Sequence, residues 1–172
     1  IGIGETREER IESLLVLRML HEKFEHLQEI IIQNFRAKSG TRMEGAPEPD
    51  LDDLMWTVAV ARIIFGPEMN IQTPPNLNQG HVNDLVHAGI NDWGGISPLT
   101  PDHVNPEAPW PKIQELSKQM VGSGKVLTER LALYPEFILN IDQWADENVQ
   151  PPLFHLRDQQ GFAREDNWSP GQ

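Results

Sequence analysis

The sequence predicts an α/β protein in which short parallel strands alternate with helices. Two observations carry this expectation. Apolar residues recur at helical spacing over several segments, and between those segments lie short β-branched or apolar runs that end in loops rich in Gly, Pro and amides. Such alternation is typical of right-handed crossovers that build a parallel sheet. On the pattern alone, an arc of a barrel and one half of a doubly wound sheet both remain open.

The N-terminal part contains the clearest helix signal. Residues Ile1–Glu5 are apolar and glycine-bearing, like the end of a buried strand that runs into a turn, which indicates a chain cut in mid-fold. Thr6 and Glu9 have the spacing of a capping box, so a helix is expected from about Thr6 to Gln28. The β-branched run Ile30–Ile32 predicts a strand covered on both faces, as in parallel sheets.

The same cycle then repeats. A Gly- and Pro-rich loop at residues 36–49 leads to a helix that begins with Asp50 and stops at Gly66-Pro67. Met69–Gln72 is the next predicted strand, and residues 73–76 are its loop.

A third cycle follows directly. Asn78 is expected to cap a helix that ends at Gly89, and Ile90–Trp93 is the next predicted strand. A long Pro-rich loop, Ser97–Pro109, precedes a helix that Trp110-Pro111 opens and that ends near Gly122 and Gly124.

The pattern weakens toward the C-terminus. Residues 125–134 are compatible with a strand or an extended connection, and residues 135–145 predict a short helix. From Asn148 onward the chain is polar and carries Pro and Gly. We therefore expect a β/α domain over residues 1–147 and an irregular tail or linker over residues 148–172.

Composition excludes several classes of protein. The 172 residues include no cysteine, so this chain alone holds no disulfide framework, no zinc ribbon and no cysteine-bound iron–sulfur cluster. The formal charge of −12 argues against a nucleic-acid partner, because phosphate binding needs clustered Lys and Arg. No apolar run approaches the ~20 residues of a membrane span. We expect a cytoplasmic protein without a membrane partner.

Candidate binding residues stand where the predicted strands end, which is where parallel α/β proteins bind their ligands. Amides dominate there, and an amide offers both a donor and an acceptor, which suits a pyrimidine ring or a polyol. The alternative is that these amides satisfy loop backbone. The candidate residues are Gln33, Asn34, Arg36, Gln72, Asn76, Asn91 and Asp92. Because side chains alternate along a strand, Gln33 and Asn34 are expected to face opposite ways unless the strand has ended.

A second candidate is the turn formed by Gly2, Ile3, Gly4 and Glu5. Two glycines let backbone approach a nucleotide closely, but the third glycine of the dinucleotide-binding motif is missing, since Arg7 stands there. A tight strand-to-helix turn is the alternative reading. The six histidines show no metal-ligand spacing, so no metal site is predicted in this chain.

Distinctive stretches occur along nearly the whole chain. They are residues 33–43, Pro47-Glu48-Pro49, residues 56–62, Met69–Gln72, Pro74–Leu77, residues 89–95, Ser97–Asp102, residues 104–111 and the tail from Gly161 to Gly171. Together these stretches resemble the first half of the deazaflavin chromophore (FO) synthases.

The resemblance implies the C-terminal part of a radical SAM enzyme on a partial TIM barrel, with the N-terminal half missing. A 4Fe–4S cluster would cleave S-adenosyl-L-methionine (SAM), and the resulting radical would cyclise a tyrosine-derived 5-amino-5-(4-hydroxybenzyl)-6-(ribitylimino)uracil adduct. This lyase reaction loses ammonia and forms 7,8-didemethyl-8-hydroxy-5-deazariboflavin (FO), the chromophore of coenzyme F-420. Gly2–Glu5 would lie against the adenosyl group, and the strand-end amides would face the ribityl-uracil substrate.

The family's Cys-x₃-Cys-x₂-Cys cluster loop has no counterpart here. We therefore expect the cluster ligands in the missing N-terminal part, and no activity from this chain alone. The resemblance also implies a reductant protein for the cluster and a second-half tyrosine–uracil synthase module, fused or separate. Two alternatives stay open: the partner radical SAM module that joins tyrosine to 5-amino-6-ribitylaminouracil, and a cluster-free half-barrel that binds or scaffolds.

Overall fold

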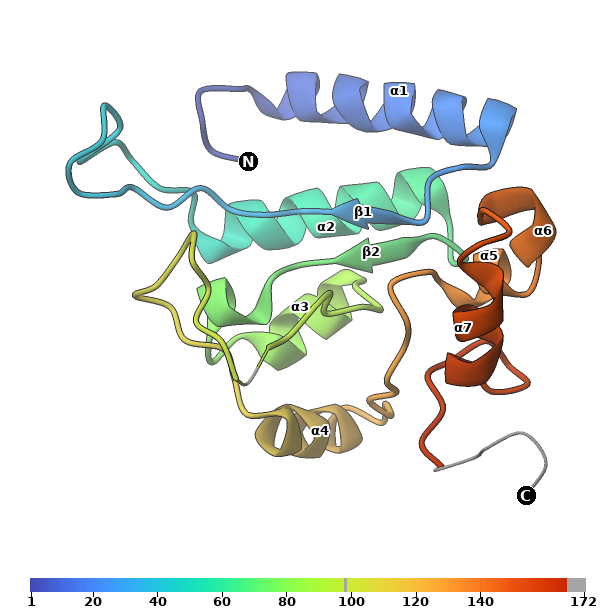
Figure 1. Ribbon diagram of the computed structural model, residues 1–172. Coiled ribbons are helices and arrows are strands. Elements are labelled where there is room, and N and C mark those ends of the chain that lie inside the picture. Colours follow the sequence, from blue (N-terminus) through green and yellow to red (C-terminus); the bar gives the residue numbers. More distant parts are fainter. Residues whose placement is uncertain (98, 167–172) are drawn as a thin grey trace. The chain divides into compact units, whose positions relative to one another are not determined.

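The computed structural model describes residues 1–97 and 99–166, and the chain divides into two compact units (Figure 1). The first unit is Ile1–Lys125 and the second is Val126–Gln172. The first unit is α/β with a small parallel sheet, which confirms the predicted class. A domain boundary after residue 147 stays a prediction.

Two long helices of the first unit begin where their own side chains cap them. In α1 (Arg7–Phe24), Thr6 accepts from the Glu9 amide at 3.2 Å, and Glu9 accepts from the Thr6 amide at 2.7 Å, which confirms the capping box. The helix ends before Gln28 because Glu25 adopts the left-handed conformation. Helix α2 (Leu51–Phe65) is capped by Asp50, whose carboxylate accepts from the Asp53 amide, and it ends at Gly66 as expected.

The strands of this unit follow one another in parallel and in sequence order. Strand β1 (Glu29–Ile31) pairs with β2 (Asn70–Gln72), with Ile30 opposite Ile71. On the far side of β1, the Ile1 nitrogen donates to the Gln33 carbonyl and the Phe35 amide donates to the Ile1 carbonyl, which is the bonding pattern of a parallel ladder.

The predicted strand Ile90–Trp93 is wrong in extent, since it reduces to one parallel bridge between Gln72 and Asp92. The reason lies just beyond it: Asp92 accepts from the Gly94 amide at 2.5 Å, and Gly94 has a φ of 70°, so the chain turns out of the sheet immediately. The four extended segments at residues 1, 29–35, 70–72 and 92 nevertheless form one consecutive parallel array.

The loop after β2 contains a 3₁₀ helix, η1 (Pro75–Asn78), that the sequence did not predict. Helix α3 (Val82–Ala88) begins at His81, so the expectation that Asn78 caps it is wrong. The Asn78 side chain instead donates to Oδ1 of Asn34 at 3.2 Å and to the Pro74 carbonyl at 3.2 Å. Helix α4 (Ile113–Gly122) begins after Lys112, slightly later than expected, and ends at Gly122.

The core of the first unit lies between the strands and the helices, and Figure 1 shows α2 running beside β1 and β2. Ile30 and Ile71 are buried on the same face of the sheet. Val58 and Ala61 of helix α2 are also buried. On the opposite face, Ile31 is 55% exposed. The expectation that β1 is covered on both faces is therefore wrong for this chain.

The second unit is helical in its described part. Two short helices, α5 (Pro135–Ile138) and α6 (Ile141–Trp144), replace the single helix expected there, because Asn140 departs from helical backbone angles between them. Helix α7 (Gln150–Leu156) lies within the segment expected to be irregular. Its two prolines occupy the first turn, where a missing amide hydrogen costs nothing. Among the described residues, no helix is both long and apolar enough to cross a membrane.

Candidate functional site

The Gly2–Glu5 turn is closed by its own carboxylate. Glu5 accepts from the Gly2 amide at 2.6 Å and from the Ile3 amide at 2.9 Å. Burial raises the pKa of Glu5, but the hydrogen bonds from Gly2, Ile3 and Arg10 outweigh it and lower the pKa to about 2. The Gly2 and Ile3 amides are therefore occupied, and the outward surface of the turn consists of the Ile3 side chain, 71% exposed, and Gly4, whose Cβ position is open space.

Arg10 connects this turn to α2. Its guanidinium donates to Glu5 at 2.8 Å, to Asp53 at 2.6 Å and to the Thr57 hydroxyl at 3.1 Å, while only 9% of the residue is exposed. Burial lowers the pKa of Arg10, but its hydrogen bonds to Asp53 and Glu5 outweigh it and raise the pKa overall. The turn is thereby fixed to two helices.

Gln33 and Asn34 face opposite ways, as the alternation predicts. Asn34 is buried and accepts from Asn78 of η1. Gln33 is exposed, two residues along from exposed Ile31 on the uncovered face of the sheet. Only Gln33 is placed to meet a ligand on that face, while Asn34 holds η1.

Arg36 also contacts η1. Its guanidinium donates to Glu48 at 2.7 Å and to the Leu77 carbonyl. The hydrogen bond from Arg36, followed by one from the Ala37 amide, lowers the pKa of Glu48. The two ends of the 36–49 loop are thereby joined to each other, and Arg36 anchors them to η1.

Asn76 ties η1 to the long loop 97–109. Its amide nitrogen donates to Asp102 at 2.9 Å and to the Ala108 carbonyl at 3.1 Å. Asp102 also accepts from Asn105 at 2.9 Å and from the Val104 amide at 2.9 Å. Hydrogen bonds from Asn105, Val104 and Asn76 lower the pKa of Asp102 to about 2, so it is a carboxylate at neutral pH.

Gln72 shares a face of the sheet with Ile31, but it is buried, at 7% exposure, and its partner Glu29 was not among the predicted site residues. Its amide nitrogen donates to Glu29 at 2.5 Å, and its Oε1 occupies the space that a Cβ of Gly94 would need. In the ladder, Glu29 pairs with Asn70, so Glu29 and Gln72 are diagonal neighbours. The sequence offered no signal for Glu29, because the predicted strand began at Ile30, whereas β1 begins at Glu29.

Asn91 does not lie with the other predicted binding residues. Its Oδ1 accepts from the Ile71 amide at 2.8 Å and from Arg62 at 2.9 Å. Arg62 lies in the last turn of α2, near the start of β2 rather than its end. Asp92, in contrast, lies opposite Gln72 and accepts from Gly94. The structure thus joins Asn34, Arg36 and Asn76 through η1. It places Gln33 and Gln72 on the face of Ile31, with Gln33 exposed and Gln72 buried.

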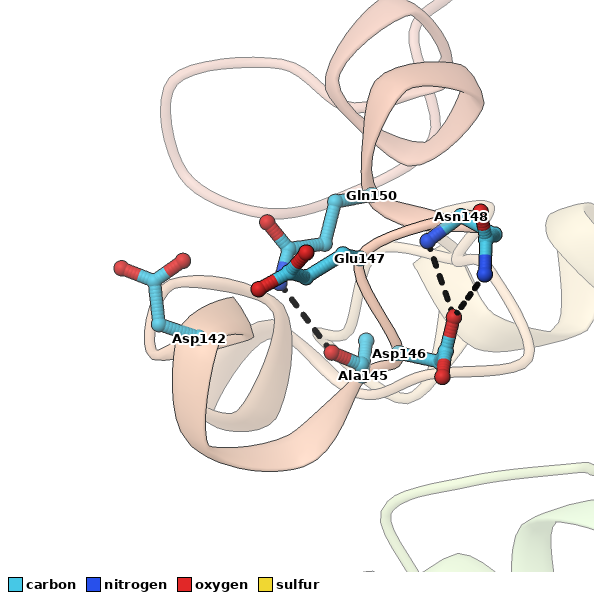
Figure 2. A pocket seen from close by; sticks show the side chains of 6 residues that line it. All are labelled: Asp142, Ala145, Asp146, Glu147, Asn148 and Gln150. Atoms are coloured by element: carbon cyan, nitrogen blue, oxygen red, sulfur yellow. Dashed lines mark hydrogen bonds between the residues drawn. The ribbon is translucent and has the colours of Figure 1, made fainter.

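The second unit contains a hollow of about 700 Å³, none of whose lining residues was predicted. Figure 2 shows that the backbone and side-chain nitrogens of Asn148 donate hydrogen bonds to Asp146, at 2.9 and 2.7 Å. The carboxylates of Asp142 and Glu147 do not point toward Asp146. The residues that the structure describes contain no group of three His, Asp or Glu able to hold a metal.

Together the fold and these residues define a parallel α/β protein with polar side chains gathered where its strands end. The chain is 52% identical over 167 residues to the FO synthase of Streptomyces coelicolor, 49% over 164 residues to the 7,8-didemethyl-8-hydroxy-5-deazariboflavin synthase of Methanopyrus kandleri, and 46% over 169 residues to an FO synthase of Mycobacterium tuberculosis. The resemblance to the FO synthases is confirmed, and this chain is a homologue of one segment of them.

These matches cover 96%, 95% and 97% of this chain. The chain in turn spans 19%, 48% and 20% of those relatives. No family model and no solved structure matches it.

Proposed function

We propose that this chain is the substrate-side segment of an enzyme that forms FO in coenzyme F-420 biosynthesis. The parent would be a cytoplasmic radical SAM lyase on a partial TIM barrel, acting on the ribityl-uracil adduct of tyrosine with loss of ammonia. The observation that carries the proposal is the 49% identity to a Methanopyrus kandleri protein named for this product, of which the chain spans 48%. The consecutive parallel strands support it, because an arc of a barrel requires that order.

The Gly2–Glu5 turn would contact SAM through apolar surface rather than through its backbone amides. Its Gly2 and Ile3 amides are occupied by Glu5, so they are not donors for the nucleoside. Exposed Ile3 and the open surface of Gly4 would instead hold the flat adenine ring. When bound, SAM supplies the radical that starts the reaction.

The 4Fe–4S cluster does not fit this chain. The sequence has no cysteine, and the described residues offer no alternative ligand group. The cluster ligands would therefore belong to other sequence of the parent, and a reductant protein would serve the cluster as a partner. The second-half tyrosine–uracil synthase module would supply the adduct, fused or as a separate protein.

The substrate would lie against the uncovered sheet face and the rim beside η1. Gln33 presents an exposed amide on that face, while Gln72 is buried there against Glu29 and Gly94 and lies opposite Asp92. Arg36 and Asn76 hold the adjoining loops to η1 and to one another. These groups would bind and orient the uracil and ribityl groups and exclude water. Asn91, which is engaged with Arg62, would act by holding the sheet.

A segment exchange tests the proposal. The matched 167 residues of the Streptomyces coelicolor relative would be replaced by this chain, and FO formation from the supplied adduct would be followed by fluorescence. We expect FO formation, and none from a version that lacks the segment. A chimera that consumes only tyrosine and 5-amino-6-ribitylaminouracil would instead favour the partner module. A folded chimera that is inactive in both assays would favour the cluster-free binding module, an alternative that is compatible with the absence of cysteine.

The SAM assignment needs its own test. Gly4→Val places a branched side chain on open surface at a φ of 117°, and Gly45→Val does the same at a φ of 74° in the 36–49 loop. Both substitutions put a branched side chain at a positive φ, which is strained. Equilibrium dialysis of SAM against the chimera should show a loss of affinity for Gly4→Val only. Equal affinities in the two variants would contradict the placement of SAM at this turn.

A further inference from the structure

Two buried oxygen atoms without a hydrogen-bond partner lie in the segment directly after β2. They are Oγ1 of Thr73 and Oδ1 of Asn76, and neither has a partner among the described residues. Thr73 is 0% exposed and Asn76 is 3% exposed. A buried polar atom left unpaired costs stability, and folded proteins retain few of them. Two within four residues, at the carboxyl end of a parallel strand, mark a place where a partner group belongs.

The orientation of the Asn76 amide is fixed by chemistry. Its nitrogen faces the Asp102 carboxylate and the Ala108 carbonyl, and both of these groups accept hydrogen bonds without donating any. The reversed amide would place its oxygen against two other oxygens. Both N–H bonds are consequently used, and Asn76 has only an acceptor left to offer.

Asp102 is itself held in place. Asn105, which is 5% exposed, donates to the same carboxylate oxygen that receives Asn76, and the Val104 amide donates to the other. A second link joins η1 to the same loop without involving Asn76: Gln79, at the end of η1, donates to the Pro109 carbonyl at 2.8 Å. The loop position and the orientation of Asn76 are therefore separable by mutation.

We propose that Thr73 and Asn76 form a subsite that binds an N–H or O–H donor of the substrate, with Asp102 as the positioning residue that keeps Oδ1 of Asn76 available. This proposal rests on the proposed function and adds that the substrate group recognised here is a hydrogen-bond donor. A pyrimidine N–H and a ribityl hydroxyl both supply the required donor.

Thr73→Val gives the sharpest test, because it removes the hydroxyl at nearly constant volume. The active chimera is used, with FO as the probe, and binding is measured by FO fluorescence. We expect affinity for FO to fall by roughly tenfold, while the melting temperature stays equal or rises, because an unpaired buried hydroxyl is gone. Unchanged affinity overturns the role of Thr73, whatever the melting temperature. A lower melting temperature with unchanged affinity would identify a structural hydroxyl.

The positioning role of Asp102 is tested against the second loop link. Asp102→Asn places an amide opposite Asn76 and lets both amides reverse, so affinity for FO should fall by about tenfold. Gln79→Leu removes only the other link and should leave affinity unchanged. If Gln79→Leu weakens binding as much as Asp102→Asn, loop position accounts for the effect and the positioning role is wrong.

Two analogues identify the donor. One is FO methylated at the pyrimidine N–H, and the other carries a methyl group in place of the ribityl chain. The Thr73→Val and Asp102→Asn effects should vanish for the analogue that lacks the recognised donor; full effects with both analogues overturn recognition of the pyrimidine N–H and of the ribityl hydroxyls. If the unaltered chimera makes FO and both variants bind it normally, the subsite fails while the proposed function stands. A chimera that neither makes nor binds FO would sink the proposed function itself.

Discussion

Arg10 shows how one buried cation organises the beginning of the chain. Its charge is balanced by Glu5 and Asp53, which lie on different segments, and both carboxylates keep about a fifth of their side-chain surface exposed. Removing one member of a buried ion pair leaves the others unpaired, which costs more than the intact pair contributes.

We expect Arg10→Met to lower the free energy of unfolding by about 2–4 kcal/mol, because two carboxylates and the Thr57 hydroxyl each lose a buried charged donor. The control is Arg18→Met, which breaks an exposed i,i+4 pair with Glu22 and should cost less than about 0.5 kcal/mol. Urea denaturation of the two variants measures the difference. Equal costs would mean that Arg10 is not a structural link.

The pKa of Glu5 gives a prediction about acid stability. The folded-state pKa, about 2, lies below the ordinary value of 4.5, so the carboxylate contributes its full stabilisation above pH 4.5 and loses it as the pH falls toward 2. Glu5→Gln should flatten the melting temperature against pH in that window. Asp102 titrates in the same direction, so part of the slope should remain. An unchanged slope in Glu5→Gln would contradict the hydrogen bonds assigned to this turn.

At the scale of elements, Arg62 holds the ends of two helices to the sheet. Its guanidinium donates to the carbonyls of Gly66 and Met69 at 2.8 and 2.7 Å and to the Gly89 carbonyl at 2.8 Å. Gly66 and Gly89 are the C-caps of α2 and α3, where the helix dipole favours a positive charge. Carbonyl groups at the end of a helix have no backbone amide partner within the helix, and Arg62 supplies N–H donors to them instead.

Arg62→Lys keeps the charge but not the planar fork, and one ammonium does not span carbonyls from two helices. We expect a loss of about 2–4 kcal/mol in the free energy of unfolding, from several hydrogen bonds to a charged group. Hydrogen exchange should speed up in residues 66–72 and 89–92 before it does in α1. Uniform acceleration across all helices would indicate that Arg62 does not act locally.

The difference between what the sequence predicted and what the structure contains follows the range of the interaction. The capping box of α1 involves Thr6 and Glu9, three residues apart, and it was predictable. Asn78 was expected to cap the next helix, yet its partner Asn34 lies 44 residues away. Asn91 likewise pairs with Arg62 from a neighbouring helix. A local pattern carries no information about such partners.

The same limit applies to the strands. Alternation predicted that Gln33 and Asn34 face apart, but the face that is covered depends on where the helices pack. The candidate site was predictable as a set of strand ends, since chain direction alone places these at one edge. Glu29 and Asp102 were not selected, because their roles come from Gln72 and Asn76 on distant segments.

At the scale of the whole molecule, the exposed apolar side chain of strand β1 bears on association. Ile31 is 55% exposed on the sheet, whereas Ile63, 81% exposed, lies on helix α2. Exposed strand faces and edges promote association more than scattered apolar residues do.

We therefore expect the 172-residue chain to associate with itself as its concentration rises, and Ile31→Thr to reduce that association while keeping strand propensity. Ile63→Thr is the control and should have little effect despite its greater exposure. Sedimentation velocity over a range of concentrations measures both. A monomer at every concentration, or a larger effect from Ile63→Thr, would contradict the prediction that the chain associates through the strand surface at Ile31.

The alternation along residues 30–34 also determines which changes in chain length the protein tolerates. Deleting one residue there would turn Asn34 away from Asn78 and bring Gln33 against the core, so every later side chain of the segment would exchange its environment. The 36–49 loop has no such parity and can absorb insertions between its anchors at Arg36 and Glu48. Related chains should therefore vary in length within that loop and keep a constant count from Ile30 to Asn34.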